Sequence, residues 1–134
     1  MKYLGLDLGT KTLGLAISNG LIATSLKTIR YEDIDKLILE LEKIIKEYDI
    51  NCLVLGFPKN MNGTIGPQAE YCLKFKGMLE ETTNLEVIMI DERLTSRQAD
   101  VIMLSADMSR NKRKKNVDKL AATIILQTYL DQKR

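Results

Sequence analysis

The sequence predicts a single α/β domain in which helices cover both faces of a mixed five-stranded sheet. Three observations carry this expectation. Strand-like segments fill the first thirty residues, two apolar runs of the buried-strand type follow, and amphipathic segments of helical period separate or follow those runs. The chain has 134 residues, 45% of them hydrophobic, which suits one domain with a sizeable core.

Strand periodicity marks the start of the chain. Leu4, Leu6 and Leu8 alternate with other residue types, which predicts a strand over about residues 2–8. Two further strands are expected at about 13–18 and 21–30. We place turns at 9–12 and at Asn19-Gly20, and these turns would make the three strands antiparallel neighbours, because Asn-Gly is a strong hairpin signal.

Helical and strand-like segments alternate in the rest of the chain. In order, we expect a helix at about 32–48, a strand at 52–56, a loop at 57–67, a helix at about 67–81, a strand at 86–91, a helix at about 95–105, a loop at 107–115 and a final helix from Asn116.

Capping and breaking residues set several of these boundaries. Pro67 suits the first turn of its helix, because that position needs no backbone N–H. Thr95, with Gln98 three residues later, fits a capping box, and Asn116 fits an N-cap. The polar and basic composition of residues 107–115 favours a loop between the last two helices.

Composition excludes several classes of chemistry. The chain has no histidine, which removes imidazole bases, His-ligated zinc and Ser-His-Asp or Cys-His catalysis. Cys52 and Cys72 lack metal-ligand spacing, so we expect both to be buried and reduced. No signal peptide and no apolar run of membrane-spanning length is visible, which favours a cytoplasmic protein.

Acidic residues stand at the ends of the expected core elements. Asp7 lies within an apolar strand, where an unpaired charge is costly. The pair Asp91-Glu92 ends a strand that we expect to run parallel to the first, two positions away, and Asp118 lies in the first turn of the final helix. Ligand sites of open sheets lie at the carboxyl ends of such strands. Carboxylates that converge there would repel one another unless divalent cations such as Mg²⁺ or Mn²⁺ neutralised them.

Each of these acids also has a purely structural interpretation. Asp7 could accept hydrogen bonds from the backbone amides that follow it, as in an Asx-turn. Glu92 could form only an ion pair with Arg93 or Arg97. Asp118 could complement the dipole at the start of its helix.

A basic cluster directly precedes Asp118. Its members are Arg110, Lys112, Arg113, Lys114 and Lys115. Positive charge beside a carboxylate site suits a polyanion, although the net charge of the whole chain is only +2. Aromatic residues are few, which favours recognition of backbone and shape over base stacking. Lys11, in the first turn, and Arg93 are further candidates for phosphate contacts.

Four sequence blocks, spread in order over nearly the whole chain, form one pattern. They are G-L-D-L-G-T-K-T-L-G-L-A from Gly5, L-G-F-P-K-N-M-N-G-T-I-G-P-Q-A from Leu55, D-E-R-L-T-S-R-Q-A from Asp91 and N-V-D-K-L-A-A-T-I-I-L-Q-T-Y-L from Asn116. Together they closely resemble the YqgF family, the Holliday-junction-resolvase-like proteins that are also described as pre-16S rRNA nucleases.

This resemblance implies a ribonuclease H-like fold, a bacterial cytoplasmic location and a nuclease that matures the 5′ end of small-subunit ribosomal RNA. Carried over to this sequence, it implies that Asp7, Glu92 and Asp118 are catalytic and hold the metal. The sequence leaves open whether Asp91 or Glu92 is the second acid, and whether the protein is a monomer or a homodimer.

Three functions are therefore compared. The first is a metal-dependent endonuclease acting on structured nucleic acid, most of all an rRNA precursor. The second is a non-catalytic or junction-type module that binds branched DNA, since a fold alone does not confer activity. The third follows from D-L-G-T-K-T, which is also like the phosphate loop of actin-type ATPases and sugar kinases, but such enzymes need two of these domains and this chain has room for one.

Overall fold

The computed structural model describes residues 1–58, 66–91 and 110–133, and for residues 110–120 it describes the backbone alone. In chain order, the elements are β1 (Tyr3–Leu8), β2 (Thr12–Ser18), β3 (Thr24–Arg30), α1 (Ile34–Glu47), β4 (Cys52–Phe57), α2 (Pro67–Thr83), β5 (Glu86–Asp91) and α4 (Arg110–Lys133).

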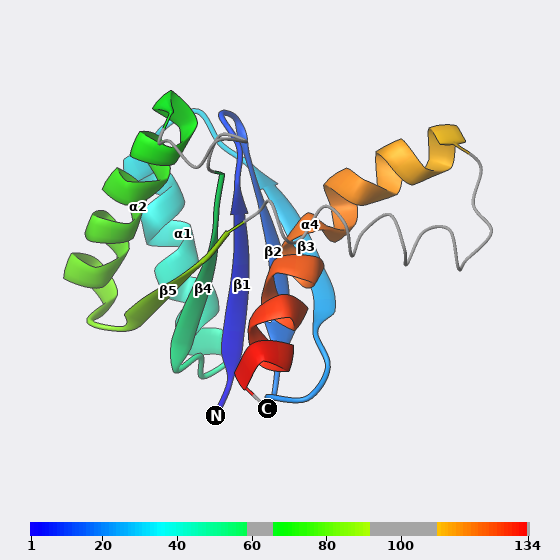
Figure 1. Ribbon diagram of the computed structural model, residues 1–134. Coiled ribbons are helices and arrows are strands. Elements are labelled where there is room, and N and C mark those ends of the chain that lie inside the picture. The colour runs from blue at the N-terminus through cyan, green and yellow to red at the C-terminus, as the bar shows by residue number, and fades with distance from the viewer. Residues whose placement is uncertain (59–65, 92–109, 134) are drawn as a thin grey trace.

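One five-stranded sheet, in the order β3-β2-β1-β4-β5, forms the middle layer (Figure 1). The central strand β1 pairs antiparallel with β2 and parallel with β4, and β4 pairs parallel with β5. The carboxyl ends of β1, β4 and β5 therefore lie at one edge of the sheet. This confirms the predicted mixed sheet and the predicted relation of its first and last strands.

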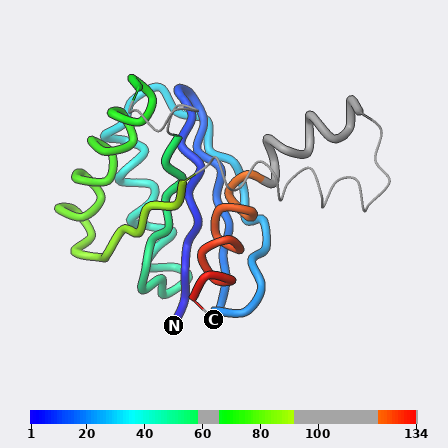
Figure 2. The backbone as a smooth tube through the Cα atoms, in the orientation of Figure 1, coloured from blue at the N-terminus to red at the C-terminus, as the bar shows by residue number. Residues whose placement is uncertain are grey.

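Helices cover both faces of the sheet, as predicted: α1 and α2 pack on one face and α4 on the other (Figures 1 and 2). The alternating side chains of β1 divide between these faces. Leu4, Leu6 and Leu8 belong to the core under α1 and α2, whereas Tyr3 belongs to the core under α4. Even-numbered positions of β1 thus face α1 and α2, and odd-numbered positions face α4.

Local signals explain the boundaries of α1 and α2. The Asp33 carboxylate accepts a hydrogen bond from the Asp35 amide, which caps the start of α1. Pro67 occupies the first turn of α2, as expected. This helix ends at Thr83, and its C-cap residue Asn84 adopts the left-handed conformation that asparagine tolerates well (φ 59°).

The third strand begins later than predicted, at Thr24 rather than near residue 21. The hairpin turn between β2 and β3 is longer because local and distant hydrogen bonds hold its backbone. The Gly20 amide donates to the Ser18 hydroxyl (3.0 Å), and Gly20 adopts a φ of 114°. The Ala23 amide donates to the side chain of Gln127 in α4 (2.9 Å), so that residue is bonded to a helix rather than to β2.

The prediction of a loop at 107–115 and of an N-cap at Asn116 is wrong from residue 110 onward, because α4 begins at Arg110. Lysine and arginine are good helix formers, and neither glycine nor proline occurs between Arg110 and Lys133 to interrupt the helix. The predicted helix at 95–105 and most of the predicted loop at 57–67 lie outside the described residues.

Both cysteines are free and buried, as the sequence indicates. Within the ranges given above, none of the helices is long and apolar enough to cross a membrane.

Candidate active site at the carboxyl end of the central strand

Asp7 is the second-last residue of β1 and is half-buried on the face covered by α4. Its neighbour across the antiparallel pair is Gly14. A Cβ atom placed on Gly14 would lie 3.6 Å from the Asp7 Cβ and 3.7 Å from the Ala122 Cβ. Gly14 therefore leaves the space beside the Asp7 carboxylate clear, and Ala122 marks the part of α4 that lies over it.

Close packing sets the position of α4 along β1. A Cβ atom on Gly5 would lie 2.7 Å from the Leu126 Cβ and 2.9 Å from the Ala122 carbonyl oxygen, so only a hydrogen atom fits there. Leu126 thus lies over Gly5, and Ala122 lies between Gly5 and Gly14. The helix runs antiparallel to β1, so its earlier residues lie toward the strand end that carries Asp7.

The position of Asp118 follows from this packing. It precedes Ala122 by four residues in α4, which is about one helical turn, or about 6 Å along the axis. Residues four apart share a side of a helix. The backbone at Asp118 therefore lies one turn before Ala122, the α4 residue that lies beside Gly14 and Asp7.

Polar contacts secure the other end of α4. The side-chain amide of Gln127 donates to the Leu21 carbonyl (3.3 Å), and Lys133 donates to the Tyr3 hydroxyl. The Lys133 ammonium also lies over the Tyr3 ring, 4.9 Å from its centroid. These contacts fix the register of α4 against the sheet.

Asp91 lies on the other face of the sheet from Asp7. In β5, Val87 and Met89 pack with the core under α1 and α2, and Ile88 and Ile90 pack with the core under α4. Side chains alternate along a strand, so Asp91 is on the α1 and α2 side. Of the two candidates for the second acid, Asp91 does not share a face with Asp7, and Glu92 lies outside the described residues.

The structure describes the basic candidates unequally. Lys11 is exposed in the turn between β1 and β2. Arg93 lies outside the described residues. The remaining candidates occupy the first turns of α4 rather than a loop: Arg110, Lys112, Arg113 and Lys114.

No three acidic or cysteine residues come close enough to hold a metal ion among the residues whose side chains the structure describes. That part of the chain includes Asp7 but neither Glu92 nor the Asp118 side chain. The three predicted metal ligands therefore remain a proposal.

Sequence reasoning missed Arg30. This exposed residue pairs with Thr12 at the end of β3, next to the turn that carries Lys11. Ile29 points into the core under α1 and α2, so Arg30 lies on the same face as Asp7. The sequence shows Arg30 directly after Ile29, but that Ile29 faces the core under α1 and α2 becomes known only from the strand pairing.

Sequence reasoning also missed hydrogen bonds behind Asp7. The Gln68 side-chain amide donates to the Leu8 carbonyl (3.0 Å), and the Tyr31 hydroxyl donates to the Gly9 carbonyl (2.5 Å). No local sequence pattern predicts these hydrogen bonds, because they join residues that are far apart along the chain.

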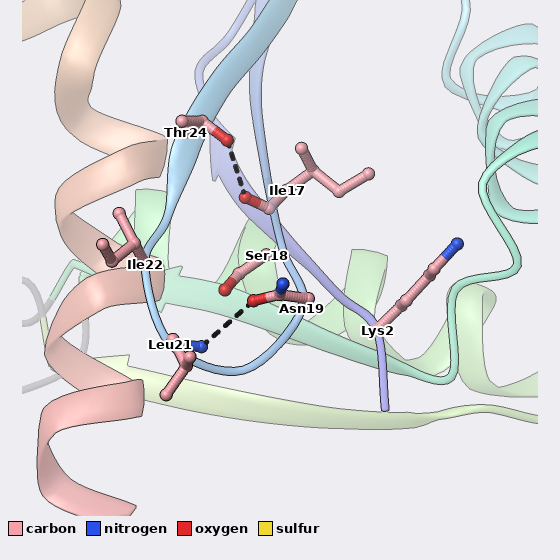
Figure 3. Close-up of a pocket in the computed structure, with 7 residues that line it drawn as sticks. All are labelled: Lys2, Ile17, Ser18, Asn19, Leu21, Ile22 and Thr24. Atoms are coloured by element: carbon pink, nitrogen blue, oxygen red, sulfur yellow. Dashed lines mark hydrogen bonds between the residues drawn. The ribbon is translucent and has the colours of Figure 1, made fainter.

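A cavity of about 370 Å³ lies at the opposite end of the sheet, where the β2–β3 turn approaches the start of β1 (Figure 3). Ser18 of this cavity pairs with Tyr3 at the start of β1, whereas Asp7 is near its end. The cavity is therefore separate from the candidate active site. Its lining residues are Lys2, Ile17, Ser18, Asn19, Leu21, Ile22 and Thr24.

Comparison with known proteins shows the family to which this chain belongs. The model of a family described as "RuvX: Holliday junction resolvase" matches residues 1–132. The chain belongs to the RuvX family. This confirms the resemblance to YqgF proteins, because RuvX and YqgF denote the same family.

Two bacterial relatives carry the name "Putative pre-16S rRNA nuclease". The protein from Clostridium beijerinckii is 53% identical over 133 residues, which cover 98% of this chain and 96% of the relative. The protein from Bacillus subtilis is 50% identical over 135 residues, which cover 98% of each chain. The similarity to these relatives thus extends over nearly the whole chain.

Solved structures show the same fold at low sequence identity. The fowlpox virus Holliday junction resolvase has a TM-score of 0.58 and 15% identity, covering 98% of this chain and 99% of the viral one. RuvC of Thermus thermophilus, in complex with a Holliday junction, has a TM-score of 0.53 and 14% identity. The match covers 74% of this chain and 69% of the RuvC chain. This RuvX protein therefore has the ribonuclease H-like fold of those resolvases, as the sequence predicts.

Proposed function

We propose that this protein is a divalent-metal-dependent endonuclease that cleaves structured RNA, with the precursor of 16S rRNA as its substrate in the cytoplasm. The observation that carries the proposal is the place of Asp7. A half-buried carboxylate stands at the carboxyl end of the central strand, beside a glycine that leaves space and under a helix row that leads back to Asp118. The names of relatives about half identical over the whole chain support the choice of substrate.

Asp7, Glu92 and Asp118 are the residues that would hold Mg²⁺ or Mn²⁺. Carboxylate oxygens are the hard ligands that these ions prefer, and the chain offers no histidine to favour zinc. Asp91 lies on the face of the sheet opposite to Asp7, which supports Glu92 as the second acid. When bound, a pair of such ions activates a water molecule and stabilises the leaving oxygen of a phosphodiester.

Basic residues of the chain would hold and orient the RNA backbone. Lys11 and Arg30 are exposed beside the turn that follows Asp7. The basic cluster lies in the first turns of α4, and the first turn of this helix has no acidic residue. The helix dipole, however, favours anions at this end of a helix. This local electrostatic conflict is resolved if the cluster and Arg93 contact phosphates of a polyanion.

Cleavage of defined substrates tests the proposal. Purified protein should cut RNA that contains the precursor 5′ extension of 16S rRNA in Mg²⁺ or Mn²⁺, and EDTA should stop the reaction. The comparison substrate is a four-way DNA junction, because the matching family model is described as a Holliday junction resolvase. Cleavage of the junction alone would support that second candidate function, and binding without cleavage in either metal would contradict the proposed nuclease.

Replacing Lys112, Arg113 and Lys114 together by alanine should weaken RNA binding and flatten its salt dependence. Every phosphate that the variant no longer neutralises should reduce the slope of log affinity against log salt by up to about 0.9 for a duplex-like target. The measurement is fluorescence anisotropy over a salt series. A matched control replaces Lys36, Lys43 and Lys74 by alanine, since these exposed lysines lie on α1 and α2, behind the sheet. Equal slopes in both variants would place the RNA surface elsewhere.

A further inference from the structure

The two carbonyl groups that directly follow Asp7 are both held by side chains. The Gln68 amide from α2 donates to the Leu8 carbonyl at 3.0 Å. The Tyr31 hydroxyl, just after β3, donates to the Gly9 carbonyl at 2.5 Å. Two segments far from β1 in sequence thus fix the backbone at the point where the strand leaves the sheet.

A second tyrosine completes this arrangement. The Tyr31 and Tyr71 hydroxyl groups lie 2.9 Å apart. A phenol has a single proton, and that of Tyr31 is directed to the Gly9 carbonyl, so Tyr71 is the donor to Tyr31. Burial raises the pKa of Tyr31, which keeps its hydroxyl protonated and able to donate to the Gly9 carbonyl.

The turn after Asp7 is also closed by its own backbone. The Gly9 amide donates to the Thr12 carbonyl (2.8 Å), and the Tyr31 amide donates to the Lys11 carbonyl (2.9 Å). Tyr31 therefore holds both arms of the turn, one through its side chain and the other through its backbone.

We propose that Gln68, Tyr31 and Tyr71 are positioning residues that fix the backbone directly after Asp7 and thereby the orientation of the Asp7 carboxylate. Tyr31 and Tyr71 pack with the core under α1 and α2, whereas Asp7 lies on the α4 face. The network therefore acts through the backbone and from behind the sheet. The inference rests on the proposed function in one respect, namely that the Asp7 carboxylate binds metal.

Removal of single hydrogen-bonding groups tests this network. Tyr31→Phe keeps the ring and removes the donor to Gly9, and Gln68→Met keeps a side chain of similar length without the amide. Each variant should bind Mn²⁺ roughly tenfold or more weakly, as loss of the groups that orient metal ligands does. Tyr71→Phe should have a smaller effect, since Tyr31 can still donate to Gly9. Titration calorimetry measures the affinity, and hydrogen exchange of the Gly9 amide, which should become faster, reports on the turn itself.

Tyr48→Phe is the matched control, because Tyr48 caps the end of α1, far from the carboxyl end of β1. It should leave Mn²⁺ affinity and Gly9 exchange as in wild type. In RNA cleavage, the network variants should lose kcat with an unchanged KM, since no network residue faces the substrate side.

The two proposals fail in different ways. Wild-type protein that binds Mn²⁺ but cleaves no RNA would refute the nuclease, and Gly9 exchange and Mn²⁺ affinity would still decide on the network. If Tyr31→Phe and Gln68→Met both retain wild-type exchange at Gly9 and wild-type Mn²⁺ affinity, the network has no positioning role. If Tyr31→Phe does not fold, Gln68→Met decides, because Gln68 is only half-buried.

Discussion

Replacing Asp7 by asparagine should abolish metal-dependent RNA cleavage while the protein remains folded. Asparagine has nearly the same size but carries no charge, so the half-buried position beside Gly14 still accommodates it. The loss should reach about a thousandfold or more in kcat, because metal-held charge stabilisation is worth several kcal/mol and each 1.36 kcal/mol changes a rate about tenfold. Single-turnover cleavage of precursor RNA in Mn²⁺ measures this effect.

Asp91→Asn is the matched control for that experiment. It makes the same chemical change at the end of a neighbouring parallel strand, but on the α1 and α2 face of the sheet. We expect this variant to keep cleavage within a few-fold of wild type. Full activity in Asp7→Asn would remove Asp7 from the active site, and a large loss in Asp91→Asn would show that the acids have been assigned to the wrong faces.

Replacing Gly5 by alanine should destabilise the protein and reduce its activity together. The new methyl group would meet the Leu126 side chain at 2.7 Å and the Ala122 carbonyl at 2.9 Å, and a backbone atom cannot move without moving α4. Overpacking of this kind costs about 1–3 kcal/mol of the free energy of unfolding. In the proposed metal site, a displaced α4 would also move Asp118 relative to Asp7, so cleavage should fall even at temperatures where the variant is fully folded.

Gly77→Ala provides the comparison, because it is the same substitution at an exposed position of α2 with no atom within 4 Å of the new methyl group. It should stabilise the protein by about 0.5–1 kcal/mol, since alanine loses less backbone entropy than glycine in a helix. Denaturant unfolding measures both variants. A Gly5→Ala protein as stable and active as wild type would mean that α4 is not packed against β1 as closely as described.

Much of the fold could be predicted because the local signals agree with the tertiary structure. Alternating leucines in β1, the stripe of α1 and Pro67 at the start of α2 each specify an element without reference to the rest of the chain. The start of β3 and the start of α4 were misplaced for the opposite reason. Gln127 decides where the β2–β3 turn ends, and a polar, basic composition does not distinguish an exposed helix from a loop.

The candidate site was predictable in part. Asp7 stands out in the sequence as a charge within an apolar strand, and the sheet order follows from the sequence of elements. The faces of the sheet on which Asp91 and Arg30 lie depend on the register of their strands. This register cannot be assigned from the sequence until the neighbouring strand is known. The network of Gln68, Tyr31 and Tyr71 depends on how α2 packs behind β1, and no local pattern encodes that packing.

The central claim is that Asp7, Glu92 and Asp118 share one metal site, and a crystal structure grown with Mn²⁺ tests it most directly. Anomalous scattering would locate the ion without any assumption about its ligands. We predict a peak at about 2.0–2.3 Å from a carboxylate oxygen of Asp7, the range typical of hard cations, with oxygens of Glu92 and Asp118 around the same ion or its immediate neighbour. A peak bound elsewhere, with the Glu92 and Asp118 carboxylates on other faces of the molecule from Asp7, would contradict the account.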